Sequence, residues 1–178
     1  MTLPRRDRLP AEAAQGLDRD ERVTAWAEMS GGGFAVTTPR GLWLPSGPDR
    51  RERLDWHLID RAVWRSPMLA LTVAVPRGEL GGALVIEELP ARVVAVANPR
   101  RLPPEVRLRV TRSVWYAEDQ RLRSSAGVRI VARRVSGQDG LTWHLRFAAG
   151  VDPDDPLLRA EAIRLLDATR RNVCPRPR

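Results

Sequence analysis

Short runs in which apolar and polar residues alternate, separated by glycine and proline turns, constrain this chain most. Alternation with a period of two residues is typical of a β-strand with one buried face. Such runs occur at residues 23–27, 34–38, 42–44, 54–59, 68–75, 84–87 and 92–97. A glycine cluster at 30–33 between two of them predicts a hairpin. The first half of the chain is therefore predicted to form antiparallel β-sheet.

The alternation runs longest through residues 54–64, where every second residue from Trp56 to Trp64 is apolar except Asp60. A carboxylate is a poor core residue, so we expect the strand to bend or end near Asp60. The same alternation places His57 on the opposite, outward face of this strand as an ordinary surface histidine.

Residues 102–113 carry two patterns at once. Two prolines and Glu105 are typical of the first turn of a helix. Val106, Val110 and Val114 recur at helical spacing, but apolar residues separated by single arginines also fit a strand. Helix and strand both stay open here, and we favour a short helix that runs into a strand at 114–121.

The last predicted element is an amphipathic helix over residues 156–171. Acidic residues at 152–155 supply a cap, and Pro156 suits the first helical position. One face carries an apolar stripe made of Leu158, Ala162, Leu165, Leu166 and Thr169. Residues 172–178 contain two prolines and are expected to be a frayed tail, and residues 1–20 a flexible arm with a short helix around 11–17.

A length of 178 residues suits one domain, which we place at residues 21–171. The predicted fold class is α+β and mainly antiparallel β, with a barrel or strongly curved sheet closed by the C-terminal helix. Cys174 is the single cysteine, so no disulfide can form within the chain, which fits a cytoplasmic protein. The N-terminal residues lack the apolar run of a signal peptide, and no stretch is apolar enough to span a membrane.

The net charge is +8, and every basic residue is an arginine. Residues 121–178 hold 12 arginines against 6 acidic residues, whereas residues 1–60 hold 9 against 10. Arginine enrichment is typical of GC-rich genomes, but codon bias alone would spread the excess evenly. The uneven distribution favours a surface for anions in the last third, because the guanidinium group binds phosphate through two parallel hydrogen bonds.

Residues 38–44 (TPRGLWL) and 54–64 (LDWHLIDRAVW) resemble the third strand and a tryptophan-containing segment of bacterial pleckstrin-homology-like barrels. That resemblance covers mainly residues 21–97, and it implies a barrel that binds phosphoinositides or peptides. The proline-led segment at 102–113 and the number of strands depart from the simple barrel. Most of the chain is also similar to a group of uncharacterised actinobacterial proteins, which implies no activity.

The strongest candidate binding site is a basic face on a predicted hairpin of strands 128–135 and 141–148. Alternation places four residues on one side of it, expected to be exposed: Arg129, Arg133, His144 and Arg146. Such a face fits a phosphate-rich ligand, although a solvated sheet face gives the same pattern. A second candidate is an aromatic pocket lined by Trp43, Trp56 and Trp64, which core packing explains equally well.

No motif for catalysis or metal binding stands out. Asp152, Asp154 and Asp155 are better explained by helix capping than by a cation, and the glycine cluster precedes a strand without the lysine of a phosphate loop. No metal or cofactor is predicted. We expect a non-enzymatic binding or scaffold domain for a protein or an anionic ligand. Nucleic-acid binding by the basic last third is the first alternative, and an enzyme with a site built from distant residues is the second.

Overall fold

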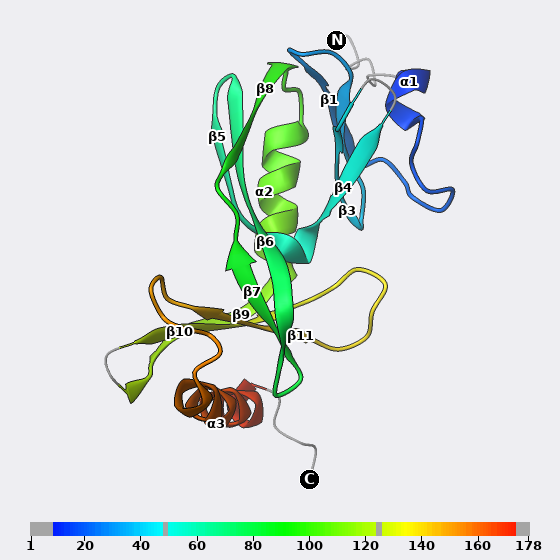
Figure 1. Ribbon diagram of the computed structural model, residues 1–178. Coiled ribbons are helices and arrows are strands. Elements are labelled where there is room, and N and C mark those ends of the chain that lie inside the picture. The colour runs from blue at the N-terminus through cyan, green and yellow to red at the C-terminus, as the bar shows by residue number, and fades with distance from the viewer. Residues whose placement is uncertain (1–8, 48–49, 124–125, 174–178) are drawn as a thin grey trace.

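The computed structural model describes residues 9–47, 50–123 and 126–173. Eleven strands join in one mostly antiparallel sheet that curls strongly, and no pairing among the described residues closes it into a barrel. The α+β class with a strongly curved sheet and a C-terminal helix is therefore confirmed (Figure 1).

The strands are β1 (Ala25–Met29), β2 (Phe34–Thr37), β3 (Gly41–Pro45), β4 (Arg51–Asp55), β5 (Ile59–Arg65), β6 (Met68–Leu80), β7 (Ala83–Glu88), β8 (Arg92–Asn98), β9 (Val114–Arg121), β10 (Gly127–Arg133) and β11 (Thr142–Phe147). The helices are α1 (Ala11–Ala14), α2 (Leu102–Ser113) and α3 (Pro156–Val173), with a short 3-10 helix, η1, at Trp56–Leu58.

Strand β6 belongs to both halves of the molecule. Its first half pairs with β5 on one side and β8 on the other, while its second half pairs with β7. Strand β7 continues the sheet through a short parallel pairing with β11, which leads to β10 and β9. One unbroken strand thus connects an upper half, built from β1–β5, β8 and α2, to a lower half (Figure 1).

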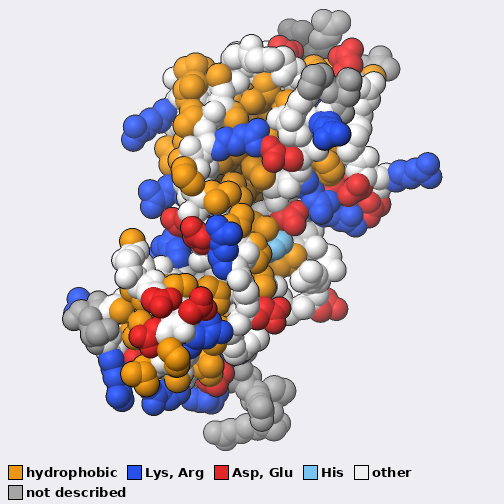
Figure 2. Space-filling model, viewed as in Figure 1, with side chains coloured by type: hydrophobic (Ala, Val, Ile, Leu, Met, Phe, Trp, Pro, Cys, Tyr) orange, Lys and Arg blue, Asp and Glu red, His pale blue; other side chains and the backbone are white. Residues whose placement is uncertain are grey.

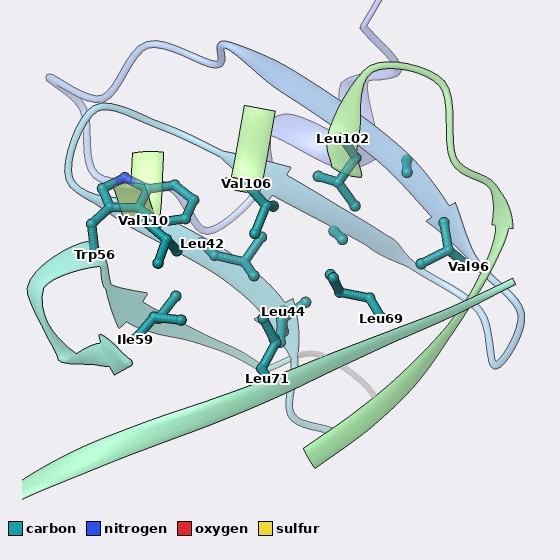
Figure 3. Close-up of a cluster of buried hydrophobic side chains, with 12 residues drawn as sticks. Leu42, Leu44, Trp56, Ile59, Leu69, Leu71, Val96, Leu102, Val106 and Val110 are labelled. Atoms are coloured by element: carbon teal, nitrogen blue, oxygen red, sulfur yellow. The ribbon is translucent and has the colours of Figure 1, made fainter. Parts of the chain in front are cut away.

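Helix α2 resolves the ambiguity of residues 102–113. It lies inside the curl of the upper sheet, where it buries Leu102, Val106 and Val110 against Leu69 and Val96 (Figure 3). We call this hydrophobic cluster the first core. Strand β9 follows at once, as the favoured interpretation predicted. Leu108, which a strand would place on the same face as these three residues, is 39% exposed, as the helical spacing requires.

Helix α3 closes a second core, built from β6, β7, β9–β11 and the helix itself. Ala162, Leu166 and Thr169 of the predicted stripe are buried, and the Asp155 carboxylate accepts hydrogen bonds from the backbone N–H groups of residues 157 and 158 at 2.8 and 3.2 Å. The helix is confirmed, although it runs to Val173. The rest of the predicted tail lies outside the described residues. Among the described residues, the two largest hydrophobic clusters therefore each contain one of the longer helices, α2 or α3.

The described part of the predicted N-terminal arm packs onto the upper sheet. Ala13 of α1 is fully buried in a small cluster with Trp26, Val36 and Trp43. The Arg51 guanidinium donates a hydrogen bond to the Ala13 carbonyl at 2.8 Å. Among the described residues, no helix has both the length and the apolar character needed to cross a bilayer.

The strand expected to begin at residues 54–59 and to bend or end near Asp60 is interrupted a few residues earlier. Strand β4 ends at Asp55, η1 makes a turn, and β5 begins at Ile59. Trp56 is buried in η1, where its indole N–H donates to the Thr38 carbonyl at 2.9 Å. A 3-10 helix has three residues per turn, so it interrupts the two-residue alternation of side chains along a strand. His57 therefore does not lie on the outer face that the alternation predicted for it.

Candidate functional site

Part of the predicted basic face lies between the two cores, and only the rest of it faces solvent. The register of β10 and β11 pairs Arg129 with Arg146 and Arg133 with Thr142, which puts the predicted residues on one side, as expected. However, Arg133 is only 3% exposed and His144 is fully buried. The expected exposure is therefore wrong for these two residues. Alternation determines which side chains share a face, but it does not reveal what packs over that face.

Arg133 makes hydrogen bonds that join the two halves of the molecule. Its guanidinium donates to the Ile59 carbonyl at 3.3 Å, to the Ser113 hydroxyl at 2.9 Å and to the Asp60 carboxylate at 3.3 Å. Burial lowers the pKa of Arg133, and the charge of Asp60 opposes that shift. A buried arginine is tolerated only with such partners, so its role here is structural.

The other two arginines of the predicted face also pair with carboxylates of the chain. Arg146 contacts Asp60 at 3.4 Å and makes an ion pair with Glu88. Arg129 pairs with Asp119 of β9 at 2.8 Å. Figure 2 shows acidic and basic side chains next to one another at the waist of the molecule. These guanidinium groups are already neutralised, which weakens the case for a phosphate-rich ligand on this face.

The two histidines meet at the same place. Their ring centroids lie 6.0 Å apart, with the rings at 61° to each other. Burial, together with the charges of Arg133 and His57, lowers the pKa of His144 to about 4, and the charge of Asp60 opposes this shift. Burial also lowers the pKa of His57. Both rings are therefore neutral near pH 7. We call His57, Asp60, Arg133, His144 and Arg146 the junction cluster.

Within the described residues, neither ring nitrogen of His144 has a hydrogen-bond partner. The same part of the chain holds no group of three or more His, Cys, Asp or Glu side chains arranged to bind a metal ion. The junction cluster thus supplies a largely buried polar contact between the cores, and Arg146 at its edge also lines a surface pocket together with Glu88.

The three tryptophans of the predicted pocket do not come together. Trp43 packs in the small cluster beside α1, whereas Trp56 is buried in the first core and Trp64 lies partly buried against it. Trp43 and Trp56 are each less than 10% exposed. Their positions match the alternative interpretation, in which they fill the hydrophobic interior.

An exposed apolar surface lies on the outer side of β5, β6 and β8, opposite α2. The register aligns Val63, Ala70 and Val93 across the three strands, and Met68 and Ala95 form the next row. Val63, Met68 and Val93 are 37%, 40% and 54% exposed. Figure 2 shows hydrophobic side chains gathered over this part of the upper half. Adjacent exposed apolar side chains of this kind mark interaction surfaces.

Two arginines flank that surface. Arg61 and Arg65 lie two residues before and two residues after Val63 on β5, so all three share one exposed face. Neither arginine makes an ion pair within the described residues. We call these seven residues the outer sheet face: Arg61, Val63, Arg65, Met68, Ala70, Val93 and Ala95. Sequence reasoning missed it, although residues 93–97 form a continuous apolar run, which signals a strand that is apolar on both sides.

No protein-family model matches the chain, and neither a curated protein nor a solved structure matches it. The likeness to pleckstrin-homology-like barrels and to the actinobacterial group therefore stays a resemblance.

Proposed function

We propose that this protein is a non-enzymatic binding domain whose partner is another protein, and that the partner docks on the outer sheet face. The observation that supports this most is the row of Val63, Ala70 and Val93, which lie side by side across three paired strands and of which the two valines are exposed. Covering such a row removes apolar area from water, which stabilises a complex by roughly 25 cal/mol per Å² before the costs of association.

The arginines of the outer sheet face indicate which side chains the partner contributes. Arg61 and Arg65 carry positive charge beside the apolar row, and no carboxylate of the described chain pairs with them. A partner segment that combines apolar side chains with Asp or Glu would complement both features. A second copy of this chain would instead bring the same arginines face to face, so self-association through this surface is disfavoured.

A peptide selection tests the proposal directly. Random peptides displayed on phage would be selected on the immobilised full chain, and the enriched peptides would be synthesised and titrated by fluorescence polarisation. We expect enriched sequences that combine apolar residues with Asp or Glu. Val93→Glu should weaken binding at least about tenfold, because it removes a contact worth roughly 1.5 kcal/mol and adds a carboxylate.

The matched control is Leu157→Glu, which changes another exposed apolar residue, 80% exposed on α3. It should leave the affinity within about twofold of the wild type, the usual effect of a change outside an interface. Failure to enrich any peptide, enrichment of Arg-rich or Lys-rich peptides, or equal binding by Val93→Glu would each contradict the proposal. If sedimentation shows a dimer that Val93→Glu abolishes, the outer sheet face would instead be a surface for self-association.

A further inference from the structure

Exposed arginines without an ion pair lie outside the predicted basic face. Within that face, Arg129, Arg133 and Arg146 all pair with carboxylates of the chain. By contrast, four exposed arginines on and next to α2 make no ion pair within the described residues: Arg101, Arg107, Arg112 and Arg134. The nearby Glu105 already pairs with Arg109 at 2.8 Å. The solvent side of α2 is thus strongly positive.

Helical geometry puts part of this charge in a row. Arg101 at the N-cap, Leu108 and Arg112 follow one another at spacings of seven and four residues, which keeps them on one face. The opposite face holds Val106 and Val110 in the first core. At 1.5 Å of rise per residue, the row from the first to the last of these arginines spans about 16 Å.

An exposed aromatic ring follows directly after α2 in the chain. Strand β9 begins directly after α2, and its second residue, Trp115, is 52% exposed. Arg134 lies beside it, because its backbone N–H donates to the Ser113 carbonyl at 2.8 Å. The Arg134 guanidinium is 4.1 Å from the centroid of the Trp115 ring. A half-exposed indole therefore lies against the Arg134 guanidinium just after the C-terminal end of α2.

We infer that this surface binds single-stranded nucleic acid. We call it the α2 patch, and it consists of Arg101, Arg107, Leu108, Arg112, Trp115 and Arg134. Arginines in a row complement the regularly spaced phosphates of a strand, and an open indole offers a stacking platform for an unpaired base. The guanidinium that covers part of the Trp115 ring extends the stack through a cation–π contact. A membrane-binding helix needs a broad apolar face, whereas this face has a single leucine, Leu108, between arginines. The α2 patch is independent of the outer sheet face and adds a second partner.

A salt titration of a fluorescein-labelled oligonucleotide of about 12 nucleotides tests the inference. If four phosphates are neutralised, the slope of log affinity against log salt is about −3, a loss of about 50-fold between roughly 50 and 200 mM salt. Arg112→Ala should make that slope shallower by about 0.7. Trp115→Ala should weaken binding roughly 5- to 150-fold with the slope unchanged, and Trp115→Phe should retain most of the affinity.

The control is Arg164→Ala, because Arg164 is also exposed, makes no ion pair among the described residues and lies on α3. It should bind as the wild type does. Absence of binding at about 50 mM salt would overturn the inference, since phosphate contacts are strongest there. Equal losses in Arg164→Ala and Arg112→Ala, or binding to vesicles of anionic phospholipid without binding to the oligonucleotide, would also overturn it.

Discussion

Acidification should destabilise this protein through a single buried histidine. His144 is fully buried between the two cores, and burial together with the charge of Arg133 lowers its pKa from 6.5 to about 4. The folded state therefore keeps the ring neutral at pH values where the unfolded chain already binds a proton. Stability is complete above about pH 6.5 and is lost as the pH falls toward 4.

The size of the effect follows from the same two values. The difference between 6.5 and about 4 corresponds to about 3 kcal/mol once both states are protonated. Near pH 5 the unfolded state is almost fully protonated at this position and the folded state is mostly neutral, which gives a loss of about 2 kcal/mol. That is a substantial part of the free energy of unfolding of an ordinary domain.

Urea unfolding of the wild type and of His144→Leu at pH 7, 6 and 5 measures this contribution. Near pH 7 the leucine variant should be as stable as the wild type or slightly more stable, because neither ring nitrogen of His144 has a hydrogen-bond partner among the described residues. Near pH 5 the variant should be the more stable of the two by about 2 kcal/mol. Parallel pH profiles for the two proteins would refute the reasoning.

Three further predictions concern the fold. Asp60→Ala should lower the free energy of unfolding by about 3–5 kcal/mol in urea titrations, because it leaves the buried Arg133 without its carboxylate. Asp119→Ala, which breaks an exposed ion pair, should change it little. Asp155→Ala removes the cap of α3 and should cost about 0.5–2 kcal/mol, seen as a lower Tm. Leu166→Ala should cost about 2–5 kcal/mol by opening a cavity in the second core, and an unchanged Tm would contradict the packing of α3.

Local sequence patterns predicted much of the secondary structure. The two-residue alternation located most strands within a few residues, most clearly where one face is more buried than the other, as in β5. The cap at Asp155 and the stripe that contains Leu166 located α3, since both signals lie within the helix itself. The same alternation also assigned Arg133 and His144 correctly to one face of a hairpin.

Tertiary structure decided what covers each face, and therefore which side chains are available to a partner. Arg133 and His144 look like exposed surface residues in the sequence, yet β5 and the end of α2 pack over them. Val93 looks like a core residue, yet nothing in the described chain covers it. Periodicity is a property of one segment, whereas burial depends on segments distant in the chain. The sequence alone thus determined a curved antiparallel sheet with a closing helix. Only the packing of two cores around β6 decided where the free apolar surface and the unpaired charge lie.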